Sequence, residues 1–126
     1  MSINELIESL ENGSGLARAR AAADLGKLGD GKASAALRKA LDDNNSTVRS
    51  NAAFALGELG ETLAIPRLVE LMSDDDQWVR KSVAKALGIL RASAAESVLE
   101  RALNDSSELV QRNARRSLEQ IREHLS

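Results

Sequence analysis

The sequence predicts an all-α solenoid built from four two-helix repeats of 31 residues. Closely similar strings begin 31 positions apart, VRSNAAFALGELG at Val48 and VRKSVAKALGIL at Val79. The same register runs back to ARARAAADLGKLG at Ala17 and forward to VQRNARRSLEQI at Val110. Self-similarity at a fixed period of about 20 to 50 residues is typical of repeat architectures, in which each unit buries its apolar face against its neighbours.

The apolar positions keep this period through the whole chain. Four units of 31 residues account for 124 of the 126 residues, so we expect a single domain over 1–126 with no linker. The predicted repeats cover about 1–31, 32–62, 63–93 and 94–126. The columns that define them are Leu6, Leu37, Leu68 and Leu99; Leu10, Leu41, Met72 and Leu103; Leu25, Leu56, Leu87 and Leu118; and Leu28, Leu59, Leu90 and Ile121.

Each unit is predicted to hold a short helix, a polar loop and a longer Ala-rich helix. Ser2 and Glu5 have the spacing of a capping box, and Pro66 suits the first turn of its helix. Gly29 and Gly60 are natural residues to follow a helix C-terminus. The predicted helices span 2–11, 15–28, 33–41, 46–59, 64–72, 77–90, 95–103 and 108–124.

The second helix of each unit is predicted to provide most of the core. A helical wheel at about 100° per residue gathers one apolar stripe, which in the second unit is Val48, Ala52, Ala55, Leu56 and Leu59. Glycine recurs within these helices at Gly26, Gly57 and Gly88. A glycine in a helix costs about 1 kcal/mol relative to alanine, so its recurrence indicates that neighbouring helices approach closely there.

Composition excludes several classes of function. The chain has no cysteine, which excludes disulfides, thiolate metal sites and cysteine nucleophiles, and it has one histidine, His124. Its formal net charge of −2 disfavours a uniformly basic nucleic-acid binder. The N-terminus has no signal-peptide pattern, and no apolar stretch is long enough to span a membrane. We therefore expect a cytoplasmic protein that is not an enzyme and has no catalytic residue, cofactor or metal.

The repeated pattern V-R-x-x-A-A-x-A-L-G-x-L-G, followed by A-x-x-x-L-x-x-x-L-x-D, resembles the HEAT-like repeats first recognised in phycobilisome lyases. The resemblance covers all four units. It implies a right-handed α-solenoid, with the short helices on the convex side and the V-R helices on the concave side. It also implies a ladder between repeats, from Arg49 and Arg80 to the loop aspartates Asp43, Asp74 and Asp105, that frays at Asn12 and Gln111. Deoxyhypusine hydroxylases, which share this repeat, hold two irons with His-Glu pairs, and this sequence has none.

The variable columns of the second helices indicate a binding surface on the concave face. Phe54 and Trp78, the two aromatic residues, fall on these columns among basic residues. The alternatives are that these aromatics fill gaps between helices and that the charges form an ordinary solvated face. The predicted partner-binding residues are Arg20, Ser50, Asn51, Phe54, Trp78, Lys81, Lys85, Arg112 and Arg116.

The predicted function is a non-catalytic protein–protein interaction scaffold. A basic groove with two aromatics suits another protein, and in particular an acidic segment of it, better than a membrane or a nucleic acid. The chain itself is expected to be a monomer or a weak homodimer. Two alternatives stay open: a bilin lyase or tetrapyrrole-handling accessory protein, and a nucleic-acid-binding HEAT-like module.

Overall fold

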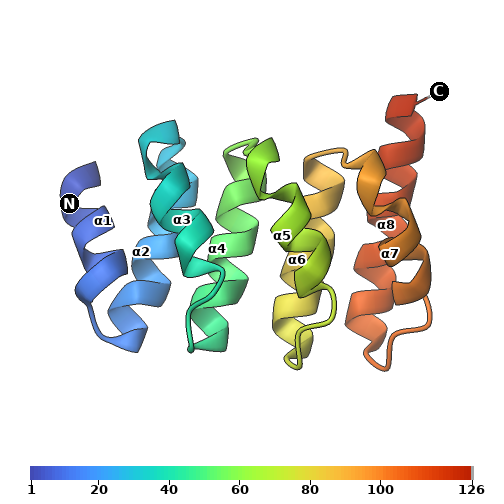
Figure 1. Cartoon of the computed structure of the whole chain (residues 1–126), viewed down its shortest axis with the longest axis horizontal. Coiled ribbons are helices and arrows are strands. Elements are labelled where there is room, and N and C mark those ends of the chain that lie inside the picture. The colour runs from blue at the N-terminus through green and yellow to red at the C-terminus, as the bar shows by residue number, and fades with distance from the viewer. Residues whose placement is uncertain (126) are drawn as a thin grey trace.

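The chain forms two layers of helices stacked along one long axis (Figure 1). This computed structural model describes residues 1–125, which contain eight α-helices, three single 3₁₀ turns and no strand. The helices are α1 (Ile3–Asn12), α2 (Gly15–Leu28), α3 (Ser34–Ala40), α4 (Ser46–Glu58), α5 (Ile65–Leu71), α6 (Gln77–Ile89), α7 (Glu96–Ala102) and α8 (Glu108–Leu125). The 3₁₀ turns are η1 (Gly31–Ala33), η2 (Thr62–Ala64) and η3 (Ser93–Ala95).

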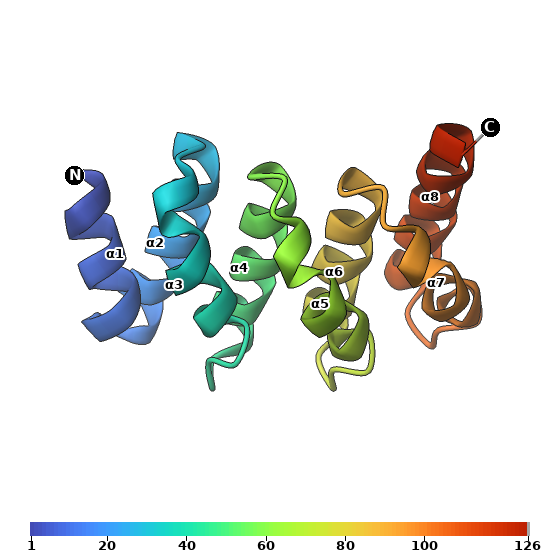
Figure 2. The ribbon, with the colours of Figure 1, turned by 45° about the horizontal axis from the view of Figure 1, so that its top comes forward.

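The odd-numbered helices form one layer and the even-numbered helices the other, as Figures 1 and 2 show from two directions. Each predicted helix is present, with both ends within one residue of the prediction. The 3₁₀ turns that lead into α3, α5 and α7 were not predicted. The architecture confirms an all-α solenoid of helical repeats.

Local sequence signals explain where the helices begin and end. Ser2 and Glu5 form the predicted capping box at the start of α1. Asn45 and Asp76 cap α4 and α6 by accepting backbone hydrogen bonds in the first turn. Gly29 and Gly60 follow α2 and α4 with φ values of 74° and 68°, in the left-handed conformation that glycine adopts without strain.

The core lies between the layers and along the stacked even-numbered helices. Helix α4 packs against both α2 and α6, and α6 packs against α8. Of the predicted stripe on α4, Val48, Ala52, Ala55 and Leu56 are fully buried and Leu59 is half-buried.

The glycines within the even-numbered helices permit a close approach between neighbouring helices. A Cβ atom placed on Gly26 would lie 2.8 Å from Ala55 Cα, and one on Gly57 would lie 3.0 Å from Ala86 Cα. These distances confirm that the repeated glycine serves packing.

Candidate interaction face

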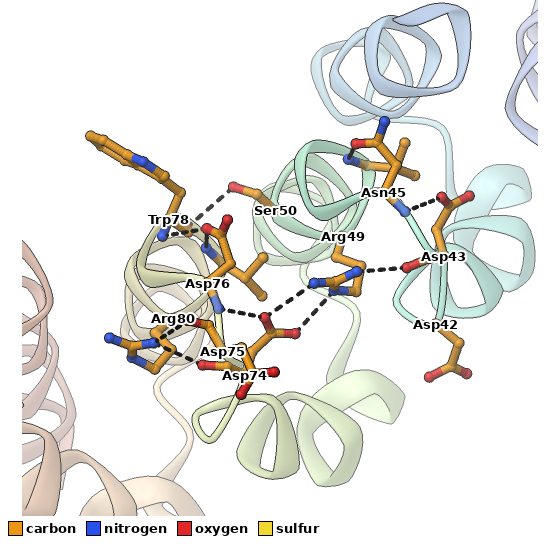
Figure 3. Close-up of polar contacts among 12 residues, drawn as sticks. Asp42, Asp43, Asn45, Arg49, Ser50, Asp74, Asp75, Asp76, Trp78 and Arg80 are labelled. Carbon is orange, nitrogen blue, oxygen red and sulfur yellow. Dashed lines mark hydrogen bonds and ion pairs between the residues drawn. The ribbon is translucent and has the colours of Figure 1, made fainter. Parts of the chain in front are cut away.

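An arginine–aspartate ladder crosses the junctions between repeats, at the edge where the even-numbered helices begin (Figure 3). At each junction the guanidinium of one repeat binds both carboxylate oxygens of the aspartate in the next repeat's loop. The Nε–Oδ2 distances are 2.9 Å for Arg18–Asp43, 3.0 Å for Arg49–Asp74 and 3.0 Å for Arg80–Asp105. Paired donors on a planar guanidinium fix the orientation of the two groups as well as their distance.

Each arginine also binds a backbone carbonyl of its own repeat. Arg49 Nη1 donates to the carbonyl of Asp43 at 2.9 Å, and Arg80 Nη1 donates to that of Asp74 at 2.8 Å. Gln111 keeps this second contact, with Nε2 2.6 Å from the carbonyl of Asp105. The predicted ladder is therefore confirmed. Its expected fraying at Gln111 is partial, because the amide keeps the contact with a backbone carbonyl and lacks only the contact with a carboxylate of a further repeat.

The ladder aspartates are acidified by their partners. Hydrogen bonds from Arg18 hold the pKa of Asp43 below its ordinary value, against the opposing effect of burial. For Asp74, burial acts to raise the pKa, but hydrogen bonds from Arg49 and from the backbone of Asp76 outweigh it and lower the pKa. The pKa of Asp105 is lowered in the same way, with burial opposed by Arg80. These aspartates are therefore charged structural groups at neutral pH.

The exposed side of the even-numbered helices carries most of the predicted partner-binding residues. On α6 a spacing of about 100° per residue puts Trp78, Lys81, Lys85 and Ile89 within roughly 80° of one another. Steps of 31 in sequence put Phe54 and Arg116 at the position of Lys85, Arg112 at that of Lys81, and the exposed acid Glu58 at that of Ile89. We call this surface the even-helix face and define it as Arg20, Phe54, Trp78, Lys81, Lys85, Ile89, Arg112 and Arg116.

Trp78 is the most exposed apolar residue of the even-helix face. Its side chain is 55% exposed, and Figure 3 shows the indole pointing away from the ladder. Its backbone N–H donates to Asp76 Oδ1 at 2.7 Å, which fixes its place in the first turn of α6. The backbone of Trp78 is therefore anchored at the start of α6, while its indole is not buried in the core.

Phe54 lies on α4 beside α6 and is half-buried. Lys85 Nζ lies 5.0 Å from the centroid of its ring, which is within cation–π distance. Phe54 thus contributes partly to packing between neighbouring helices, as the gap-filling alternative requires, and partly to the exposed face.

Ser50 and Asn51 serve contacts between helices. Ser50 Oγ lies 2.6 Å from Ser82 Oγ, and Asn51 Nδ2 donates to the carbonyl of Ala19 at 2.9 Å. Both lie at the flanks of the stripe, where a neighbouring helix partly covers them. Both residues are half-buried, so their prediction as partner-binding residues stays a prediction, with part of their hydrogen bonding already used between helices.

Positive charge on the even-helix face is concentrated on α6 and α8. Within residues 1–125, Lys81, Lys85 and Arg116 form no ion pair with a carboxylate, while Arg112 binds Glu108 at 3.1 Å. Arg20 is exposed on α2, at the other end of the array. The basic character of the face thus comes mainly from α6 and α8.

The described residues contain no group of three or more His, Cys, Asp or Glu side chains that could hold a metal ion. His124 is exposed on α8, where its Nδ1 lies 3.2 Å from Arg91 Nη1. None of the helices in residues 1–125 combines the length and the apolar character needed to cross a bilayer.

Stacked helix pairs, a side-chain ladder between repeats and an exposed face on one layer define a helical-repeat protein of the α-solenoid class. A sequence profile of HEAT repeats matches residues 3–88 and 42–119. The chain belongs to the HEAT repeat family. A comparison with curated proteins finds no match.

Solved structures with the same fold include both enzymes and designed proteins. Human deoxyhypusine hydroxylase aligns with a TM-score of 0.78 and 25% identity, over 97% of this chain and 44% of that one. A chain of the CpcE–CpcF complex of phycocyanin lyase from Nostoc sp. aligns with a TM-score of 0.71 and 23% identity, over 98% of this chain and 66% of that one. A designed armadillo repeat protein aligns with a TM-score of 0.71 and 26% identity, over 92% of this chain and 63% of that one. This chain thus spans less than two thirds of each of these structures.

Proposed function

We propose that this protein is a non-catalytic scaffold that binds another protein on its even-helix face. The observation that carries the proposal is Trp78, an indole 55% exposed in the first turn of α6, on the same helix as Lys81 and Lys85, which form no ion pair with a carboxylate within residues 1–125. Exposed aromatic and basic residues at the centre of a rigid surface are the typical anchors of protein interfaces.

The array around the face supports this role. The ladder and the glycine contacts fix neighbouring helices relative to one another, so that side chains from α4, α6 and α8 form one preorganised surface. A preorganised surface loses little conformational entropy on binding. The partner therefore meets a surface whose anchors are already in place.

An acidic protein segment suits this surface better than nucleic acid does. The loop that leads into α6 carries Asp74, Asp75 and Asp76 beside Trp78, and a continuous phosphate backbone passing over the indole would be repelled by them. A protein segment can place its acids away from that edge.

Affinity capture with matched variants tests the proposal. The immobilised chain, its Trp78→Ser variant and a Leu63→Ser control are incubated with extract of the source cell. Leu63 is 69% exposed on η2 and lies outside the even-helix face, so its loss should leave binding unchanged. A protein retained by the wild type and by Leu63→Ser, and lost with Trp78→Ser, supports the proposal. Identical capture by all three chains contradicts it.

Two other functions have distinct signatures. Binding of labelled duplex DNA that weakens steeply with salt would favour a nucleic-acid module. A shift in bilin absorbance on adding the protein would favour a lyase accessory role, for which the likeness to the CpcE–CpcF complex supplies the fold alone.

A further inference from the structure

A pocket opens between α6 and α8 on the even-helix face. Its volume is ≈ 260 Å³, below the roughly 300–1,000 Å³ of typical small-molecule sites, and suits a single side chain. Lys85 and Ile89 line it from α6, and Arg116 and Gln120 line it from α8, with Asn113 and Ser117 between them. The pocket is thus lined by two cationic side chains and one apolar side chain.

The polar groups of this pocket select for negative charge. Lys85 and Arg116 are exposed, and neither forms an ion pair with a carboxylate within residues 1–125. Ser117 Oγ donates to the carbonyl of Ala84 at 2.6 Å, and Asn113 Nδ2 donates to that of Leu109 at 2.9 Å. Those two groups are already hydrogen-bonded. Lys85 Nζ also lies 5.0 Å from the centroid of the Phe54 ring, a contact that uses none of its N–H donors, so the two cations can still donate to a ligand. A carboxylate can accept hydrogen bonds from both of them.

The distance from this pocket to Trp78 determines how many positions separate the two contacting residues in the partner's sequence. Trp78 and Lys85 are seven residues apart on α6, which corresponds to about 10.5 Å along the helix axis at ~1.5 Å per residue. An extended chain advances ~3.3 Å per residue, so about three residues cover that distance. Because Asp75 and Asp76 lie beside Trp78, the acidic group belongs at the Lys85 end and an uncharged residue belongs at the indole.

We infer that the pocket is a carboxylate-binding subsite for an extended segment of the partner. The segment places an Asp or Glu side chain between Lys85 and Arg116 and an apolar side chain on Trp78, three positions away in its sequence. This inference rests on the proposed function, since it names the motif that the even-helix face would bind.

Selection from a random dodecapeptide library displayed on phage tests the spacing. The targets are the wild-type chain, Trp78→Ser, the double variant Lys85→Gln with Arg116→Gln, and a control with Lys39→Gln and Arg101→Gln. Lys39 and Arg101 are exposed on α3 and α7, in the other layer, so the control removes the same charge elsewhere. All four substituted side chains of the two double variants are exposed, so both variants should fold.

We expect the wild type and the control to enrich peptides with an apolar and an acidic residue three positions apart. The Lys85/Arg116 double variant should lose the acidic preference and bind the selected peptides at least about tenfold more weakly, the loss of one charge-assisted contact. Two results would overturn the subsite and leave the proposed function standing. In the first, the selected peptides depend on Trp78 but carry no acidic residue. In the second, they carry the acidic residue seven positions from the apolar one, as a helical peptide would. Enrichment that is unaffected by Trp78→Ser, or absent, overturns both.

Discussion

Replacing Asp74 with asparagine should destabilise the array far more than the same change at its neighbour Asp75. The Asp74 side chain is 9% exposed and accepts from both Nε and Nη2 of Arg49, at 3.0 and 3.2 Å. Asparagine keeps one acceptor and turns an N–H group toward the guanidinium. Loss of a charge-assisted hydrogen bond with its partner left half-buried costs about 2–3 kcal/mol of the free energy of unfolding.

The expected change in melting temperature follows from the size of the chain. An unfolding entropy of about 2.1 cal/mol/K per residue gives roughly 0.26 kcal/mol/K for 126 residues. Asp74→Asn should therefore lower Tm by about 8–11 °C, measured by circular dichroism at 222 nm. Asp75 is exposed, so Asp75→Asn should change Tm by about 2 °C or less. Equal Tm values for the two variants would show that the ladder does not stabilise the stack.

The pH dependence of the same comparison follows from the lowered pKa of Asp74. A carboxyl whose pKa is lower in the folded than in the unfolded state stabilises the fold at pH values above the unfolded pKa, about 3.9. That stabilisation disappears as the pH falls toward the folded pKa. In urea titrations, the difference between wild type and Asp74→Asn should be constant from about pH 7 to 5 and shrink below about pH 4. A difference that grows in acid would refute the assignment.

Three further substitutions test other parts of the structure. Arg91 follows α6 with a φ of 51°, at the position that Gly29 and Gly60 occupy in the preceding repeats. Arg91→Gly should therefore raise the free energy of unfolding by ~1 kcal/mol and Tm by about 4 °C. An unchanged or lower Tm would contradict this. Gly26→Ala should cost about 1–2 kcal/mol in urea titration despite its better helix propensity, because the new Cβ meets Ala55 Cα at 2.8 Å. Gly31→Ala, with no atom within 4 Å, is its control and should change stability by about 0.5 kcal/mol or less. Trp78→Ser should lower Tm by about 4 °C or less, since the indole is 55% exposed, and a collapse of Tm would place Trp78 in the core.

The fold could be predicted from the sequence because the repeat presents the same evidence several times. The apolar columns and the glycines Gly29 and Gly60 define helix ends to within one residue. The same register would also have revealed Arg18, which stands 31 positions before Arg49 and pairs with Asp43, although the prediction named Arg49 and Arg80 alone.

The candidate site was harder to predict, because a surface depends on neighbours that a single helix does not specify. Ser50 and Asn51 share a variable face with Phe54 on the wheel, yet adjacent helices take up their hydrogen bonds. The pocket beside Lys85 and Arg116 also forms between two helices, and no spacing within either one encodes it.

The ladder gives the array one edge that resists stretching. From Arg18 to Gln111, the carboxylate of each loop aspartate accepts hydrogen bonds from the preceding repeat, and its backbone carbonyl accepts one from its own repeat. These contacts form an unbroken polar chain along the long axis. At the opposite edge, Arg91 Nη1 and His124 Nδ1 lie 3.2 Å apart, in a contact between the last two repeats. A bend that kept the ladder intact would therefore change the helix spacing mainly at the far edge. The repeats are thus tied most closely at the edge where the even-numbered helices begin, which is also the edge that carries Trp78.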